Sequence, residues 1–228
     1  MTTNTGSSLP ETGAAGPRSQ HRQFTEKITQ LCDDKRVQAD LRSGLGLPYT
    51  RCNRMHRHLV RFTSETMHPD ARQARYTVAS LIAARPRTAR DADATAAAGR
   101  ARDGEELDSS PRVEAQGSTA VAGTQSRFNL GASLAATVCR QGLKPDSAEG
   151  ELHLLTRQST DAFLPRLPSL IRLVLSTGAP VDWAVLLEDL EWWNHDRDRI
   201  ATRWLDSYYR TLHAHEKKAD IPPARTES

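Results

Sequence analysis

The chain has 228 residues, of which 37% are hydrophobic, with a mean hydropathy of −0.61 and a net charge of +3. It has no apolar run near the roughly 18 residues of a membrane span, and its three cysteines lack paired spacing, which argues against membrane insertion and a disulfide framework. We therefore expect a cytoplasmic protein of one or two domains, part of which lies outside any hydrophobic core.

The first third of the chain predicts a short tail followed by a helical bundle. Residues 1–20 are rich in Thr, Ser, Gly and Pro without hydrophobic periodicity, so we expect a disordered tail. Residues 21–85 contain four segments with apolar side chains at helical spacing, which predict a small bundle, the N-terminal bundle. The four apolar faces consist of Phe24, Ile28 and Leu31; Val37 and Leu41; Met55, Leu59 and Phe62; and Val78, Leu81 and Ile82.

The remaining sequence predicts a linker and a second bundle. Residues 86–125 contain few large apolar side chains and cannot offset the entropy of ordering, so we expect a flexible linker. Residues 126–213 form the predicted C-terminal bundle, in which Gly142 is expected to end the first helix and Asp182 to cap a later one. Residues 214–228 are expected to form a disordered tail. Because no alternating strand pattern occurs, the sequence predicts an all-α fold of two small helical bundles joined by a long flexible loop.

All four tryptophans lie between Pro180 and Trp204. Trp residues bury large surfaces, so we expect this segment to supply the centre of the C-terminal bundle. Trp192 and Trp193 are adjacent, and neighbouring side chains on a helix are about 100° apart, so both cannot point inward. We predict that one packs inside the bundle while the other lies at an interface between bundles or subunits. The simpler alternative is that both form a half-buried edge of the core.

Positive charge is concentrated in the N-terminal bundle, where residues 21–85 hold 12 Lys and Arg against 6 Asp and Glu. Its regularly spaced arginines are Arg51, Arg54, Arg57 and Arg61, followed by Arg72 and Arg75. On one helix the first four would line one side, and no acidic residue lies between positions 41 and 64 to pair with them. Guanidinium groups bind phosphates well, so this pattern favours a polyanionic partner over an ordinary solvated face.

Catalytic and metal-binding patterns are absent from the sequence. His56 and His58, like His213 and His215, are two residues apart and would diverge on a helix, so we predict no metal site. The acidic residues at 188–198 alternate with arginines and are interpreted as a solvated helix junction. No phosphate-binding loop or nucleophile motif occurs. We therefore expect a protein that is not an enzyme and needs no cofactor.

Four segments carry a resemblance to a known family: "FNLGASLA" (128–135), "LHLLTR" (152–157), "LPSLIRLVLSTGAPVDWAVLLEDLEWW" (167–193) and "IATRWLDSYY" (200–209). In this order and separation they resemble the CasB family, the small subunit of the type I-E CRISPR surveillance complex, Cascade. The resemblance implies a two-lobed helical subunit without catalytic activity. Its implied partners are guide RNA, target and displaced DNA, other Cascade subunits and a second copy of itself.

The same resemblance implies where basic side chains face nucleic acid. By position these are Arg42, Arg157 and Arg172, with Arg72 and Arg75 in rougher correspondence. Where some relatives have basic residues after the tryptophan pair, this chain has Asn194, His195 and Asp196. The leading hypothesis is thus a subunit that supports guide RNA and target DNA and stabilises the R-loop electrostatically. The alternatives are a regulator that reads duplex DNA and a structural adaptor without nucleic-acid contact.

Overall fold

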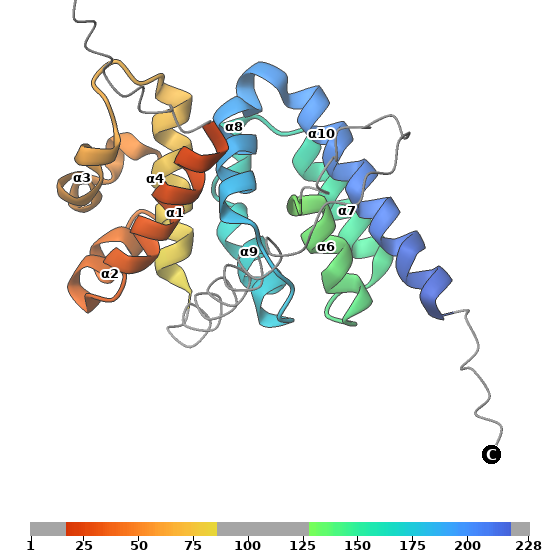
Figure 1. The fold of residues 1–228 in the computed structure, drawn as a ribbon. Coiled ribbons are helices and arrows are strands. Elements are labelled where there is room, and N and C mark those ends of the chain that lie inside the picture. The colour runs from red at the N-terminus through yellow and green to blue at the C-terminus, as the bar shows by residue number, and fades with distance from the viewer. Residues whose placement is uncertain (1–16, 86–127, 220–228) are drawn as a thin grey trace, which may run out of the picture.

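The computed structural model describes residues 17–85 and 128–219, and every regular element in these ranges is helical (Figure 1). The predicted all-α class is confirmed. The elements are α1 (Pro17–Leu31), α2 (Lys35–Arg42), the 3₁₀ turn η1 (Tyr49–Arg51), α3 (Asn53–Leu59), the 3₁₀ turn η2 (Val60–Phe62), α4 (Pro69–Ala84), α6 (Leu130–Cys139), α7 (Pro145–Thr156), α8 (Thr160–Phe163), α9 (Leu167–Ser176) and α10 (Trp183–Ala219). The predicted linker and most of both predicted tails lie outside the described residues.

Two predicted boundaries require correction. Helix α1 begins at Pro17, so residues 17–20 belong to the bundle rather than to the predicted tail. Proline suits the first turn of a helix because its φ is already helical and its missing N–H costs nothing there. At the other end, α10 continues to Ala219, six residues beyond the predicted end of the C-terminal bundle at 213. None of the helices described is both long and apolar enough to cross a membrane.

The end of α6 also differs from its prediction by one residue. Gln141, not Gly142, adopts the left-handed conformation, with φ of 60°. The N–H of Gly142 donates to the carbonyl of Thr137 (3.0 Å) and the N–H of Gln141 to that of Val138 (2.8 Å), which is a Schellman motif. Gly142 is needed for space, because a Cβ there would lie 2.0 Å from Cγ2 of Thr177.

Helix α10 organises the C-terminal bundle. Asp182 caps it as predicted, since its Oδ1 accepts from the N–H groups of Ala184 (3.0 Å) and Val185 (3.1 Å). The helix is interrupted at Asp196, whose φ of −142° and ψ of 36° are not helical. Helix α6 crosses its second half closely, because a Cβ at Gly131 would lie only 1.9 Å from the carbonyl oxygen of Trp204. The glycine of the "NLG" segment therefore permits this crossing.

The two bundles share one continuous hydrophobic core rather than two separate ones. Helix α10 as a whole contacts α1, α4, α6 and α7, and in Figure 1 its first half stands between α1 and α4 on one side and α6 and α7 on the other. The core residues include Ile28, Leu59 and Ile82 from the N-terminal bundle and Leu134, Trp193 and Trp204 from the C-terminal bundle. The position of one bundle on the other is thus fixed largely by α10.

Candidate nucleic-acid interface

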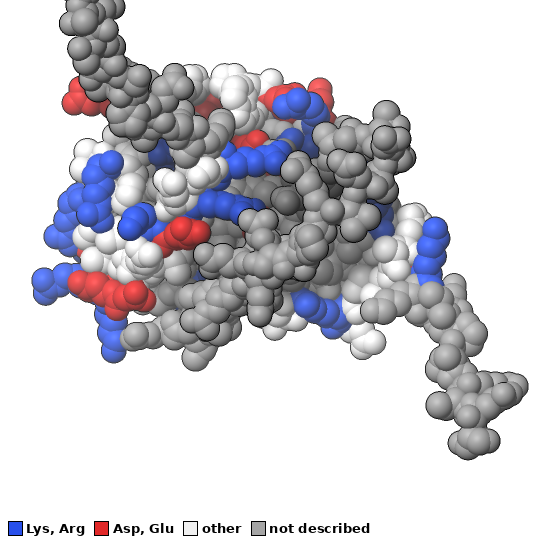
Figure 2. Space-filling model, in the orientation of Figure 1, with Lys and Arg blue, Asp and Glu red and all other residues white. Residues whose placement is uncertain are grey.

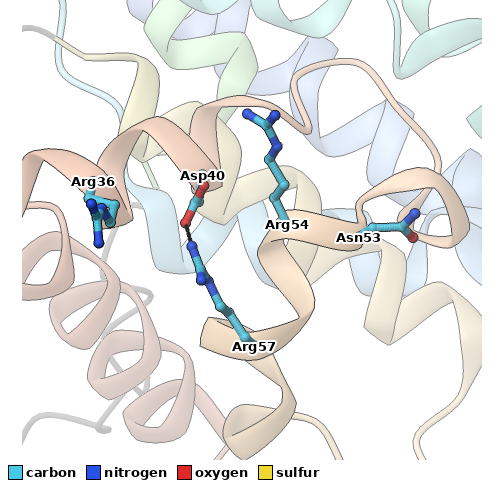
Figure 3. A pocket seen from close by; sticks show the side chains of 5 residues that line it. All are labelled: Arg36, Asp40, Asn53, Arg54 and Arg57. Atoms are coloured by element: carbon cyan, nitrogen blue, oxygen red, sulfur yellow. Dashed lines mark hydrogen bonds and ion pairs between the residues drawn. The ribbon is translucent and has the colours of Figure 1, made fainter.

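The α2–α3 hollow is the first of two basic surfaces. It is lined by Arg36, Asp40, Asn53, Arg54 and Arg57 (Figure 3). Arg57 points at Asp40 and pairs with it, and Oδ2 of Asp40 also lies 3.0 Å from Nε2 of His58. Hydrogen bonds from His58 and Arg57 lower the pKa of Asp40, so this carboxylate is charged at neutral pH and neutralises part of the hollow. On the face shown in Figure 2, several Lys and Arg side chains gather on the side of α1–α3.

The predicted continuous arginine stripe does not form. Residues 49–62 make up η1, the seven-residue α3 and η2 instead of one helix, with Cys52 at φ −94° and ψ 49° between the first two. A 3₁₀ turn has three residues per turn instead of 3.6, so side chains lose the helical register at both ends. Arg51 and Arg61 are exposed on the flanking turns, while Arg54 and Arg57 remain together on α3. The apolar face predicted for this segment does point into the core at Met55 and Leu59, which are fully buried.

The Arg42–Arg172 groove is the second basic surface and lies where the two bundles meet. Its lining combines an apolar floor with basic side chains from α2, the end of α4 and α9: Arg42, Leu45, Leu81, Ala84, Arg85, Pro168, Ile171, Arg172, Leu175 and Ser176. Arg42 and Arg172 are exposed and make no ion pair with any residue that the structure describes. Arg85 is buried, with its guanidinium carbon 5.4 Å from the centre of the Trp183 ring. The groove has a volume of about 550 Å³ and no acidic residue in its described lining.

The guanidinium groups of Arg72 and Arg75, two of the arginines assigned to nucleic acid from the sequence, make hydrogen bonds within the protein. Nη2 of Arg72 donates a hydrogen bond to the carbonyl oxygen of Ser64 (2.7 Å), which fixes the turn before α4. Arg75 donates to the carbonyl of Phe62 and pairs with Glu191 of α10, with Nε 3.4 Å from Oε1. The side chain of Arg75 is only 19% exposed. Both guanidinium groups are therefore used to hold the fold together.

Arg157 is exposed at the C-terminal end of α7, outside both basic surfaces. Arg157 makes no ion pair with the described residues, so its charge is available to a binding partner. The structure thus brings two of the three arginines implied by the family resemblance, Arg42 and Arg172, into one groove and leaves Arg157 apart from them.

The adjacent tryptophans have opposite environments. Trp193 is 1% exposed, stacks on Phe163 with ring centres 5.2 Å apart, and donates Nε1–H to the carbonyl of Gln158 (3.2 Å). Trp192 is 56% exposed and contacts the edge of the His195 ring. Both tryptophans were candidates for the interface position; the burial of Trp193 removes it, because its indole fills the core, and Trp192 is the one with an exposed surface.

Two acidic residues escaped the sequence analysis, which interpreted them as part of a solvated junction. Asp189 is 1% exposed and accepts from Arg203 (2.6 Å) and from Nε1–H of Trp204 (2.7 Å). Glu191 accepts at one oxygen from Nε2 of His21 (2.9 Å), at the point where α1, α4 and α10 meet. The sequence signal that could have indicated their burial is their position in the segment Pro180–Trp204, which also holds the four tryptophans.

The structure also assembles a group of potential metal ligands that the sequence analysis did not predict. Donor atoms of His68, Asp70 and His195 lie within 4.8 Å of one another. His68 and Asp70 belong to the start of α4, whereas His195 lies on α10. Their separation in the sequence hides this group from any spacing rule.

Comparison with known proteins identifies the family. The sequence pattern described as "CRISPR-associated protein Cse2" matches residues 37–209, which is most of the chain. The chain belongs to the Cse2 family. A chain of a solved structure described as "CRISPR RNA-guided surveillance complex" is 29% identical, with a TM-score of 0.68 over 90% of this chain and 99% of its own. A second, described as the pre-nicking form of that complex, is 28% identical with a TM-score of 0.66 over 89% and 99%.

Solved structures named CasB share the fold of this Cse2-family chain. CasB of M. ruber is 21% identical with a TM-score of 0.63, over 89% of this chain and 98% of its own. These similarities confirm the resemblance predicted from the "NLGASLA" and "PVDW" segments. A sequence search of curated proteins finds no match.

Proposed function

We propose that this chain is the non-catalytic small subunit of a type I-E CRISPR surveillance complex, Cascade, and that it supports guide RNA and target DNA and stabilises the R-loop. Membership in the Cse2 family and similarity to chains of RNA-guided surveillance complexes support this proposal. Sequence recognition then belongs to the guide RNA, and the protein needs only to hold nucleic-acid backbones. We expect it to act in the cytoplasm together with the other Cascade subunits.

The observation that carries the nucleic-acid role is the Arg42–Arg172 groove. Two exposed guanidinium groups from different bundles flank one groove, and no carboxylate in its described lining neutralises them. Arginines in this setting bind phosphates and release condensed counterions, which gives affinity without sequence preference. The exposed Arg54 and Arg36 of the α2–α3 hollow, together with Arg51 and Arg157, extend the proposed contact set. Arg72 and Arg75 are left out because the protein uses them internally.

A duplex-reading regulator finds less support in this fold. The arginine-rich segment 49–62 is where such a regulator would need its recognition helix, and only the seven residues of α3 within it are α-helical. Arg51 and Arg61 lie on the flanking 3₁₀ turns, so the four arginines of this segment are not presented together by one helix that could enter the major groove. Pairing with a second copy of the chain is part of the proposal, with the exposed Trp192 as the candidate contact.

The test measures binding of a single-stranded DNA of mixed sequence to the full-length chain over a range of salt concentrations. Replacing Arg42 and Arg172 together with Gln removes two phosphate contacts, and each contact contributes about 0.7 to the slope of log affinity against log salt for a single strand. We expect the slope to become shallower by about 1.4. Arg210→Gln is the matched control, because Arg210 is exposed on the last part of α10, remote in sequence from the groove.

Three results would count against the proposal. An unchanged slope in the double variant would remove the groove as the contact surface. A strong preference for one duplex sequence would favour the regulator. Failure of the wild-type chain both to bind nucleic acid and to copurify with a guide RNA would favour the adaptor.

A further inference from the structure

The group formed by His68, Asp70 and His195, here called the His–Asp group, lies between α4 of the N-terminal bundle and α10 of the C-terminal bundle. Oδ2 of Asp70 is 3.3 Å from Nε2 of His195 and 3.7 Å from Nδ1 of His68. The two imidazole rings meet edge to face with centres 4.9 Å apart. Three side chains with metal-binding atoms thus converge on a single small volume, although they come from opposite halves of the chain.

The carboxylate of Asp70 is held in a fixed orientation by neighbouring side chains. Its Oδ1 accepts a hydrogen bond from Nδ2 of Asn194 (2.9 Å), and Oδ1 of Asn194 accepts from the hydroxyl of Thr160 (2.6 Å). This chain of hydrogen bonds occupies Oδ1 and turns Oδ2 toward the two histidines. Metal-ligating carboxylates are characteristically supported in this way by a second layer of polar groups.

We propose that the His–Asp group binds a single Zn²⁺ ion. Two imidazole nitrogens and one carboxylate oxygen form a known zinc donor set, with water completing the coordination. Tetrahedral bonds of about 2.1 Å place donor atoms about 3.4 Å apart; Oδ2 of Asp70 lies 3.3 and 3.7 Å from the two histidine nitrogens, and all three donor atoms lie within 4.8 Å of one another. The side chains of His68, Asp70 and His195 are 58%, 23% and 48% exposed, so hydrated zinc can reach them.

Binding requires one local change at His68. Nδ1 of His68 accepts a 3.2 Å hydrogen bond from the N–H of Asp70, where it caps α4. To bind the metal, Nδ1 of His68 would give up this hydrogen bond and use the same lone pair as a metal ligand. Nε2 of His195 faces Oδ2 of Asp70, so a proton that it shares with this carboxylate must move to Nδ1 or to water before the nitrogen can bind the metal.

The zinc ion would act as a clasp between the bundles. His195 immediately precedes Asp196, where α10 departs from helical geometry, so the ion would tie the start of α4 to this break. It would also fix the His195 ring, against which Trp192 packs with ring centres 6.0 Å apart. The clasp is independent of the proposed nucleic-acid contact, because no residue of the Arg42–Arg172 groove belongs to it.

The test titrates ZnCl₂ into the metal-free full-length chain by isothermal calorimetry and follows the melting temperature in parallel. We expect one zinc ion per chain and a rise in Tm of about 5–10 °C at a zinc concentration about 100 times the Kd. His195→Gln and Asp70→Asn should each abolish both effects. Asn194→Ala should weaken zinc affinity by about 10- to 100-fold, because it releases Asp70 without removing a ligand.

His213→Gln provides the matched control, since His213 is an exposed histidine paired with Glu216 (3.3 Å) on the same helix. It should leave zinc binding unchanged. The proposal is overturned if the wild-type chain does not bind zinc, if His195→Gln binds it as tightly as wild type, or if His213→Gln loses it instead. Circular dichroism of each metal-free variant verifies that it is folded. Should His195→Gln fail to fold, zinc binding by Asp70→Asn as tight as that of wild type overturns the proposal instead.

Discussion

Replacing Trp193 with Ala removes the side chain at the centre of the C-terminal bundle. The indole is 1% exposed, stacks on Phe163 and lies 4.8 Å, between ring centres, from Trp204. Its loss leaves a cavity between two aromatic rings and takes away the donor to the carbonyl of Gln158. Truncation of a buried Trp to Ala typically costs about 3–5 kcal/mol of unfolding free energy.

This loss of free energy corresponds to a large change in melting temperature. In a chain of this size, 1 kcal/mol shifts Tm by about 2–4 °C, so Trp193→Ala should melt about 6–20 °C below wild type. Thermal unfolding followed by circular dichroism at 222 nm measures the change directly. Urea denaturation then provides the free energy itself, provided that the slope against urea stays constant.

Trp192→Ala is the matched control, with the same substitution one position earlier. Because 56% of Trp192 is exposed, its removal should cost less than about 1 kcal/mol and lower Tm by no more than a few degrees. If Trp192 contacts a second copy, sedimentation velocity should show weaker self-association of this variant at unchanged stability. Equal drops in Tm for the two variants, with self-association unaffected, would refute the division into a core and an interface tryptophan.

Three further predictions concern stability. Gly131→Ala should lower the free energy of unfolding by about 1–3 kcal/mol, measured by urea denaturation, because the new Cβ would meet the carbonyl of Trp204. Gly150→Ala has open space around the new Cβ and should raise the free energy of unfolding by about 0.5–1 kcal/mol. Asp189→Ala should cost about 1–3 kcal/mol, since it leaves the buried Nε1–H of Trp204 without this acceptor. The pKa of Asp40 lies below its ordinary 3.8, so the carboxylate stabilises the fold above about pH 4 and the effect is lost as pH falls through the lowered pKa. Asp40→Asn should therefore be less stable than wild type at pH 7, and the difference should shrink in urea titrations below pH 4.

Hydrophobic periodicity predicted the core well because it depends only on local helix geometry. Ile28, Leu41 and Leu59, chosen for their spacing, are all fully buried. Helix ends were predicted less accurately, since they depend on a few competing hydrogen bonds. At the end of α6 the left-handed residue is Gln141, whereas the neighbouring Gly142 lies where a Cβ would meet Thr177.

The candidate site was harder to predict because a sequence shows charges but not what faces them. Arg75 has the same spacing signal as its neighbours, yet its partner Glu191 lies 116 residues away. Arg42 and Arg172 face one groove because the two bundles dock on each other, which no local pattern encodes. The family resemblance implied a nucleic-acid contact for these two arginines by position, and the packing of the bundles accounts for why they lie together.

The concentration of tryptophans and acids in α10 follows from its place between the bundles. Asp189 and Glu191 are two residues apart and therefore point about 200° apart on the helix. Asp189 accepts from Arg203 and Trp204 beyond the break at Asp196, so it holds the two halves of α10 together. Glu191 accepts from α1 and α4, so it holds the N-terminal bundle against α10. A helix that packs against both bundles therefore needs polar partners on opposite faces, and α10 has them in Asp189 and Glu191.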